Sequence, residues 1–290
     1  MAGSFSRGRA RAADVLAELP GARVIASATA ATPDPTGSGV PAPALTVKGL
    51  GKRYGGVQAV DDISLRLGAG ERMGVIGPNG AGKTTLFKMV AGDVAPTTGS
   101  IDLFGRDVTK LDTARRARLG VGRTFQVSNL FRDMTVLDNV RVAARGGSAQ
   151  ARIFWRTQGQ RDQITTRATE MLDSVGLFDR REDTVADLSH GEQRQLEIAM
   201  ALVGEPRILL LDEPAAGLSA AERTTLRRLI EALPRTLPIL LIEHDMSLAL
   251  GLTDRVMCME NGRHVVTGTP DEVRDHPVVK EIYLGRRDKK

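Results

Sequence analysis

A glycine-rich segment is the first part of this sequence whose residue types and spacing indicate chemistry. Backbone amides of such a segment can surround a polyphosphate, and every fixed position of the phosphate-loop pattern G-x-x-x-x-G-K-S/T is filled. Lys83 is expected to neutralise the outer phosphates, and the Thr84 hydroxyl to bind Mg²⁺. The segment therefore predicts a nucleotide site, with an ordinary glycine-rich turn as the alternative. Its residues are Gly77, Pro78, Asn79, Gly80, Ala81, Gly82, Lys83, Thr84 and Thr85.

Two adjacent carboxylates follow a short apolar run later in the chain. The run covers residues 208–211, and Asp212 and Glu213 come directly after it. Acids at the carboxyl end of a buried strand lie at the edge of an open α/β sheet where ligands bind. We expect Asp212 to hold Mg²⁺ through water, and Glu213 to position or deprotonate an attacking water molecule. The pattern is weak by itself and gains weight from the phosphate loop in the same chain.

The elements that would position these motifs predict an α/β fold. Short apolar runs separated by Gly, Asp and Pro favour strands, whereas longer periodic runs favour helices. Residues 208–211 and 239–242 are wholly apolar, with a helix expected at 220–233 between them. This alternation is typical of a parallel sheet that is covered on both faces. The other expected strands are 45–50, 63–67, 73–76 and 101–103, and the other expected helices are 85–90, 113–118, 136–145, 162–175 and 189–204.

The two ends of the chain depart from this pattern. Residues 1–43 are rich in Ala, Gly, Pro, Ser and Thr, and have too few large apolar side chains to offset the entropy of ordering. They are predicted to form a disordered tail, with a short helix at 12–19 as the exception. Residues 286–290 are predicted to be a basic tail. The folded domain would then span residues 44–285, with a helical part at about 127–205.

Composition excludes several classes of protein. No run of 18 apolar residues is present, so no membrane span is expected, and no apolar run follows the N-terminal arginines as a secretory signal requires. The single cysteine, Cys258, cannot form an intrachain disulfide and is expected to be a small buried hydrophobe. The net charge of +5 is spread along the chain, and with 3% aromatic residues there is little to stack on bases. We therefore expect a cytosolic protein without a nucleic-acid partner.

A third segment makes a resemblance to a known family specific. Residues 188–193, with the sequence LSHGEQ, resemble the LSGGQ signature of the ATP-binding cassette (ABC) ATPases. The phosphate loop, the signature and the acidic pair also follow one another in that family's order. The resemblance covers roughly residues 44–285. It implies a P-loop NTPase fold with a RecA-like core, an antiparallel β subdomain and a helical subdomain, and it implies ATP and Mg²⁺ as cofactors.

The resemblance implies roles for three further residues. Tyr54 matches the aromatic residue that stacks on adenine, Gln126 matches the glutamine that contacts the nucleotide and Mg²⁺, and His244 matches the switch histidine that contacts the γ-phosphate. Taken alone, Tyr54 would more often be a structural tyrosine, Gln126 a solvated side chain and His244 a cap at the end of a strand. The fixed order of the motifs favours the functional roles.

Two positions depart from the family pattern. His190 replaces the first glycine of the signature, at its third position, and Ser219 stands where many members have aspartate. The family brings two subunits together around ATP, so that Ser189, Gly191 and Glu192 of one subunit would meet nucleotide held by the other. The sequence therefore does not determine how closely the backbone at His190 approaches nucleotide on the other subunit. It also does not determine whether Ser219 forms a hydrogen bond across the two subunits.

Several segments resemble the ATPases of branched-chain amino-acid importers within the family. They are residues 123–136, 212–218 and 279–285, together with an insertion around 153–155. The resemblance implies polytopic membrane permease subunits, a homodimer or a heterodimer with a second ABC ATPase, and an indirect link to a solute-binding protein. It also implies a peripheral position on the cytoplasmic face of the cell membrane. Phe125, Leu130 and Phe131 would receive a helix of the membrane subunit, with core packing as the alternative.

Other functions remain as alternatives. Importers of urea or short-chain amides and the ATPase of lipopolysaccharide export are close relatives of the same group. A soluble ABC protein acting on ribosomes or DNA is disfavoured, because the chain has one cassette and no heptad run. A GTPase is disfavoured, because the guanine-reading Asn-Lys-x-Asp is absent. A pseudo-enzyme that binds ATP without hydrolysing it is disfavoured, because Glu213 and His244 are both present.

Overall fold

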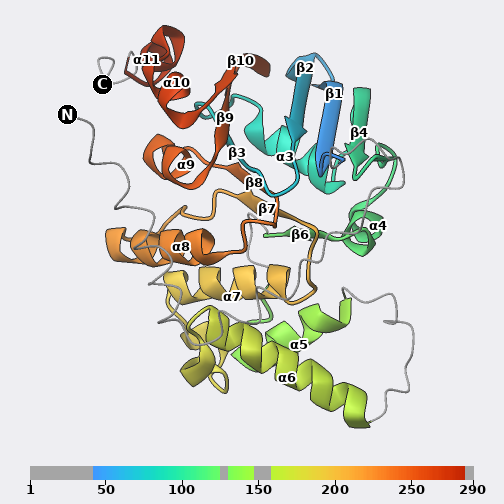
Figure 1. Cartoon of the computed structure of the whole chain (residues 1–290), viewed down its shortest axis with the longest axis vertical. Helices are drawn as coiled ribbons and strands as arrows, with labels where there is room; N and C mark the ends of the chain where they lie inside the picture. Colours follow the sequence, from blue (N-terminus) through green and yellow to red (C-terminus); the bar gives the residue numbers. More distant parts are fainter. Residues whose placement is uncertain (1–41, 125–129, 147–157, 285–290) are drawn as a thin grey trace, which may run out of the picture. The chain divides into compact units, whose positions relative to one another are not determined.

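A computed structural model describes residues 42–124, 130–146 and 158–284 (Figure 1). The predicted short helix at 12–19, the basic tail, Phe125, Gln126 and the insertion around 153–155 lie outside these residues. The described chain forms two compact units. A helical unit comprises 130–146, 158–204 and 218–234, and a sheet unit comprises the remaining described residues.

The sheet unit contains an antiparallel sheet formed mostly by the first part of the chain. Its strands are β1 (Leu45–Tyr54), β2 (Val57–Leu67), β4 (Thr98–Leu103) and β5 (Arg106–Asp107), in the order β2-β1-β4-β5. Neighbouring strands are antiparallel throughout. Buried and exposed residues alternate along much of β2 and β4, as expected for a sheet with one face toward a core.

The second sheet of this unit is mainly parallel and has the strand order β10-β9-β3-β8-β7-β6. All neighbours are parallel except β9 and β10. Every residue of β3, β7 and β8 is buried, so the predicted parallel sheet with two covered faces is confirmed. The strands are β3 (Arg72–Ile76), β6 (Val121–Arg123), β7 (Ile208–Asp212), β8 (Ile239–Ile242), β9 (Arg255–Glu260) and β10 (Arg263–Gly268).

Helices of the sheet unit pack on both faces of the parallel strands. Val75 and Met257 share a core with α3, which also packs against the antiparallel sheet. The next residues along the two strands, Ile76 and Cys258, point into a second core with α9, α10 and α11. Cys258 is a buried free thiol, as predicted. The helices are α3 (Lys83–Ala91), α4 (Thr113–Arg118), α9 (Met246–Leu252), α10 (Pro270–Asp275) and α11 (Pro277–Leu284).

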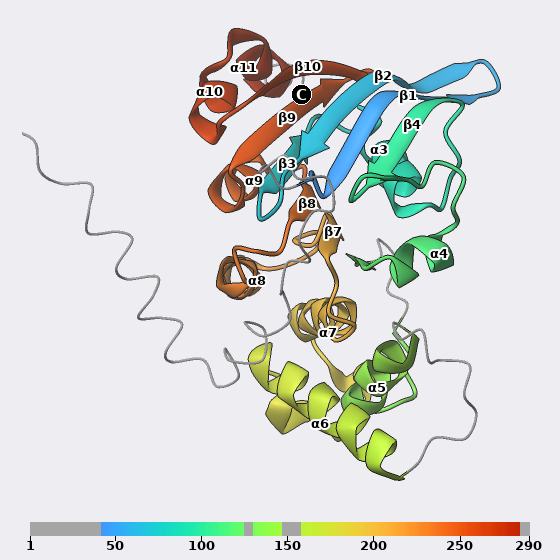
Figure 2. The same cartoon turned by 45° about the vertical axis from the view of Figure 1, so that its right-hand side comes forward.

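The helical unit consists of α5 (Val136–Gly146), α6 (Gln158–Ser174), α7 (His190–Leu202) and α8 (Ala220–Ala232). The helices α5, α6 and α7 contact one another, and α7 also contacts α8 (Figures 1 and 2). Short 3₁₀ turns lead from α6 to α7. Helix α7 therefore packs against α5, α6 and α8 within the helical unit.

Every strand and helix predicted within the described residues is present, with some ends shifted. The strand expected at 45–50 continues to Tyr54, and the helix expected at 162–175 begins at Gln158. The elements β5, β6, β9, β10, α9, α10 and α11 were not predicted. Within the described residues, no helix is both long enough and apolar enough to span a bilayer.

Candidate functional site

The phosphate loop follows β3 directly and requires glycine at two positions. Gly77 and Gly82 have φ angles of 152° and 94°. A Cβ on Gly77 would lie 2.2 Å from the backbone oxygen of Met259, and one on Gly82 would lie 2.4 Å from that of Ala59. Both positions therefore exclude a side chain, and the loop can keep the tight curvature that turns its amides inward.

Lys83 is the first residue of α3, and its side chain points into this loop. It is 4% exposed, and its ammonium donates hydrogen bonds of 2.8 Å to the carbonyl oxygen of Gly77 and 3.1 Å to that of Pro78. Burial lowers the pKa of Lys83, while the carboxylates of Glu213 and Asp212 raise it. The two acids that the sequence placed after an apolar strand thus lie near the lysine of the loop.

The amino end of α3 presents backbone donors at the same place. Its N-cap, Gly82, provides no side-chain hydrogen bond, and the first turn contains no acidic residue. The amides at the start of an α-helix have no partner within the helix and carry partial positive charge. Together with Lys83, they suit the binding of a phosphate group.

The acidic pair occupies the carboxyl end of β7. Asp212 is buried, and its amide donates to the hydroxyl of Thr124 over 3.4 Å. Glu213 has a φ of 45°, in the left-handed region that non-glycine residues rarely adopt, and its amide donates to the carbonyl of Ile242 over 2.8 Å. Such a backbone costs about 1–2 kcal/mol and persists where surrounding contacts determine it. The strain thus accompanies the residue predicted to act on water.

His244 follows β8 at the same edge of the sheet. Its Nδ1 atom lies 3.9 Å from Oε2 of Glu213 and 3.8 Å from Oε2 of Glu243. Glu243 is 0% exposed, and its Oε1 accepts the amide hydrogen of Ala215 over 3.1 Å. Burial raises the pKa of Glu243. The sequence did not single out Glu243, although its position between an apolar strand and His244 was visible.

The residues present fit Mg²⁺ bound jointly with a nucleotide. The hydroxyl of Thr84 and the carboxylate of Asp212 are hard oxygen donors, and α3 contacts β7. In the described part of the chain, no group of three His, Cys, Asp or Glu residues could hold a metal by itself. Mg²⁺ usually takes one or two protein oxygens and completes its shell with water and substrate phosphates. Gln126, the third predicted ligand, lies outside the described residues.

Tyr54 ends β1 and is 48% exposed. The ammonium of Lys52 lies 5.1 Å from the centre of its ring. An exposed ring of this kind can stack on a base, and the nearby cation adds a favourable interaction with the ring. Tyr54 therefore keeps its predicted role as a candidate adenine contact.

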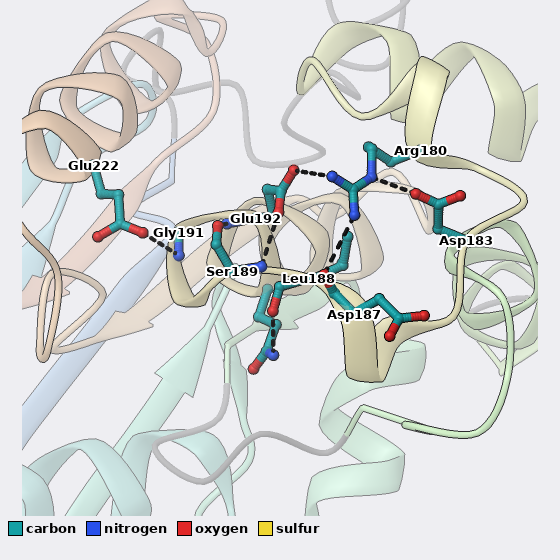
Figure 3. A network of polar contacts seen from close by, with 9 residues as sticks. Arg180, Asp183, Asp187, Leu188, Ser189, Gly191, Glu192 and Glu222 are labelled. Atoms are coloured by element: carbon teal, nitrogen blue, oxygen red, sulfur yellow. Dashed lines mark hydrogen bonds and ion pairs between the residues drawn. The ribbon is translucent and has the colours of Figure 1, made fainter.

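The signature segment lies at the start of α7 in the helical unit (Figure 3). Ser189 is the N-cap: its hydroxyl accepts the amide hydrogen of Glu192 over 3.2 Å, and Glu192 accepts that of Ser189 over 2.8 Å. Arg180 bonds to Glu192 over 3.3 Å and also to Asp183. The carboxylate of Glu192 thus has partners within its own unit. His190, the departure from the family pattern, is exposed at the first helical position.

Glu222, which the sequence did not single out, contacts the signature segment. The amide of Gly191 donates to Oε1 of Glu222 over 2.9 Å. Glu222 belongs to the first turn of α8, whose N-cap is Ser219. Figure 3 shows the contact between Gly191 and Glu222. Because Glu222 also accepts the amide hydrogen of Ser219, one carboxylate joins the signature turn to Ser219.

Comparison with known proteins identifies the family. The profile of the family described as "ABC transporter" matches residues 60–216. This chain belongs to the ABC transporter ATP-binding family. A second profile, described as "Branched-chain amino acid ATP-binding cassette transporter", matches residues 263–289 of this ABC protein. The predicted resemblance to the branched-chain amino-acid group is confirmed.

Curated relatives match nearly their whole length. The high-affinity branched-chain amino acid transport ATP-binding protein LivG of Salmonella typhimurium is 42% identical over 253 residues, covering 84% of this chain and 98% of LivG. BraF of Pseudomonas aeruginosa, which has the same description, is 38% identical with the same coverage. The lipopolysaccharide export system ATP-binding protein LptB of Escherichia coli is 36% identical, covering 83% of this chain and 97% of LptB.

A solved structure has the same fold. The crystal structure of the ADP conformation of MJ1267, an ATP-binding cassette of an ABC transporter, superposes with a TM-score of 0.73 at 26% sequence identity. The match covers 84% of this chain and 99% of that one. The predicted α/β ABC ATPase fold is thereby confirmed.

Proposed function

We propose that this ABC protein hydrolyses ATP and thereby drives import of branched-chain amino acids or similar small solutes through partner membrane subunits. The observation that carries the ATPase proposal is the grouping of Lys83, Glu213 and His244 at the carboxyl ends of β3, β7 and β8. The identity of 42% to LivG supports the choice of substrate class.

Binding of ATP would use the phosphate loop and Tyr54. The loop amides and the Lys83 ammonium would surround the β- and γ-phosphates, and Tyr54 would stack on adenine. Thr84, Asp212 and Gln126 would hold Mg²⁺, which neutralises charge on the phosphates when it is bound. The Lys83 ammonium, which donates to the carbonyls of Gly77 and Pro78, would exchange these contacts for contacts to phosphate oxygens.

Hydrolysis would depend on the two side chains beside each other at the sheet edge. Glu213 would orient the attacking water or take its proton, and His244 would contact the γ-phosphate. Nδ1 of His244 and Oε2 of Glu213 lie 3.9 Å apart, beyond hydrogen-bonding distance, and the His244 side chain is 52% exposed. The histidine can therefore bind the γ-phosphate while the carboxylate acts on water.

Transport would require a second ATPase subunit and a membrane permease. Two subunits, either identical or related, would enclose two ATP molecules, with Ser189 and the start of α7 of one facing the phosphate loop of the other. Leu130 and Phe131 would receive a helix of the permease, and Phe131 is 48% exposed. The chain would then act as a peripheral protein on the cytoplasmic face of the membrane, with a solute-binding protein contributing indirectly.

Affinity capture of tagged Glu213→Gln protein from detergent-solubilised membranes with MgATP tests this proposal. We expect recovery of polytopic permease subunits and of a second ATPase if the dimer is mixed. Glu170→Gln, which alters an exposed glutamate on α6, is the matched control without nucleotide trapping. Recovery of ribosomal or DNA-associated proteins without a permease would contradict transport. Recovery of permeases of lipopolysaccharide export would contradict amino-acid import.

A further inference from the structure

The backbone amide of Gly191 donates a hydrogen bond to a carboxylate of the same subunit. In the structure, Oε1 of Glu222 accepts its hydrogen over 2.9 Å (Figure 3). Both residues belong to the helical unit, Gly191 in the first turn of α7 and Glu222 in the first turn of α8. First-turn amides have no partner within their own helix and attract anions. Glu222 therefore occupies a donor that the signature turn would otherwise offer to phosphate.

The side chain of Glu222 packs closely against Gly191. A Cβ on Gly191 would lie 2.7 Å from both Cγ and Oε1 of Glu222. Contacts this short do not occur, so any larger residue at position 191 would displace the Glu222 side chain. A larger residue at position 191 would therefore disturb a contact within one subunit, independently of any partner.

The second oxygen of Glu222 is bound at the N-terminus of its own helix. Oε2 accepts the Ser219 amide over 2.9 Å and the Ser219 hydroxyl over 2.7 Å. The hydrogen bonds from Ser219 and then from Gly191 lower the pKa of Glu222, so the group is ionised at neutral pH. One carboxylate therefore joins Ser219, which lies six residues after Glu213 along the chain, to the signature turn.

Helix capping alone does not account for this arrangement. Thr269 and Glu272 form the same reciprocal capping box at the start of α10, with a hydrogen bond of 2.8 Å from the Thr269 amide. Among the described residues, Glu272 bonds only to Thr269 of its own capping box and to no other helix. Glu222 differs because it also reaches the amide of Gly191. A capping role does not explain this hydrogen bond to Gly191, because it joins two different helices.

We propose that Glu222 and the γ-phosphate of ATP on the second subunit compete for the Gly191 amide, so that the phosphate must displace the Glu222 carboxylate to bind there. The inference rests on the proposed two-subunit function. A backbone amide has one hydrogen, and two anions at hydrogen-bonding distance repel each other, so carboxylate and phosphate exclude one another. Displacing Glu222 also loosens its hold on Ser219, which links arrival of the phosphate to the segment after Glu213.

Glu222→Ala and Glu222→Gln in the purified transporter complex test the exchange. The readout is the MgATP concentration that gives half-maximal ATP hydrolysis, together with turnover at saturation. Losing a competing charge-assisted hydrogen bond should lower that concentration about three- to tenfold in Glu222→Ala. Glu222→Gln introduces a side chain that can still cap α8. It should also lower the half-maximal MgATP concentration, because the negative charge is gone. Glu272→Ala removes a capping box alone and should leave the concentration unchanged.

Hydrogen exchange at the Gly191 amide provides a measurement that does not need a partner. In nucleotide-free protein the amide should exchange slowly, and faster in Glu222→Ala, while Glu272→Ala should match wild type. Unchanged exchange in Glu222→Ala, or a half-maximal MgATP concentration that is unchanged or higher, would overturn the inference and leave the ATPase intact. A wild-type complex that does not hydrolyse ATP would instead refute the proposed function.

Discussion

The Nδ1 atom of His244 lies 3.8 Å from Oε2 of Glu243, a carboxyl that is fully buried. The other oxygen of Glu243 accepts the amide hydrogen of Ala215, which follows the acidic pair at 212–213 in the chain. Burial is the main cause that raises the pKa of Glu243, while Ala215, His244 and Asp245 lower it and Glu213 raises it further. An interior carboxyl thus contacts both the segment after Glu213 and the side chain of His244.

Glu243→Gln should change how stability depends on pH. Because the pKa of Glu243 is raised in the folded state, the folded protein holds a proton that the unfolded chain has released. The free energy of unfolding should then fall as pH rises from the ordinary glutamate value through the raised one, by up to about 1.4 kcal/mol per pH unit for this group. Glu243→Gln should remove that contribution.

Urea denaturation at a series of pH values measures the effect. As pH rises through this window, the unfolding free energy of Glu243→Gln should increase relative to that of wild type. Glu170→Gln, at an exposed site, should give a constant difference. A constant difference for Glu243→Gln as well would show that the buried carboxyl does not take up a proton on folding.

Glu213→Gln should reduce ATP turnover by about 10²-fold or more, because the amide cannot accept a proton from water. Binding of MgATP should be retained, since the phosphate loop is unaltered. Single-turnover hydrolysis and nucleotide binding on the same preparations distinguish the two effects. Turnover at the wild-type rate would remove Glu213 from the chemical step.

Glu213→Gly and Glu213→Ala should differ in stability although both lose activity. The φ of 45° at this residue is in a region that glycine enters without the steric penalty of a Cβ. We expect the glycine variant to be more stable than the alanine variant by about 1 kcal/mol. Equal unfolding free energies would indicate that the alanine variant relaxes to another backbone conformation.

The candidate site residues could be singled out in the sequence because their type and spacing alone form recognisable patterns. A phosphate loop is recognisable from its glycines and Lys83, and the apolar strand before Asp212 is recognisable from four consecutive apolar residues. The family resemblance then predicted roles for Tyr54 and His244. The structure lays Lys83, Glu213 and His244 at one sheet edge, which the parallel topology of β3, β7 and β8 makes necessary.

The elements that the sequence did not predict are short or mixed in character. α9 has seven residues, too few to display a helical period, and the residues of β9 mix charged ends with a buried centre. The start of α10 was visible as Thr269, Pro270 and Glu272, a capping box with proline at the first helical position. The bond between Gly191 and Glu222 joins residues 31 positions apart, so no local pattern could reveal it.

Lys83→Ala should weaken binding of MgATP by about 10- to 100-fold, because a phosphate loses a charge-assisted partner in a partly buried site. Lys88→Ala is the matched control, since it removes an exposed lysine from the other end of α3. Titration with a fluorescent ATP analogue gives both dissociation constants. Retained tight binding in Lys83→Ala would place the phosphates elsewhere.

Arg116 should contribute strongly to stability although it lies outside the nucleotide site. It is fully buried, and its guanidinium donates 2.7 Å hydrogen bonds to the carbonyls of Met89 and Val90 at the end of α3, and 2.8 Å to that of Val108. Burial lowers its pKa to about 10, so the group stays charged at neutral pH. The helix that begins with the phosphate-loop lysine therefore ends on a buried cation.

Arg116→Met should lower the unfolding free energy by about 3 kcal/mol or more, because several buried carbonyls lose their donor at once. Arg115→Met alters an exposed neighbour in the same helix and should change stability by less than about 0.5 kcal/mol. Guanidinium denaturation of both variants measures the difference. Because α3 begins at Lys83 and ends on this cation, Arg116→Met should also weaken MgATP binding, whereas a large loss of stability without weaker binding would show that the phosphate loop is held independently of the end of α3.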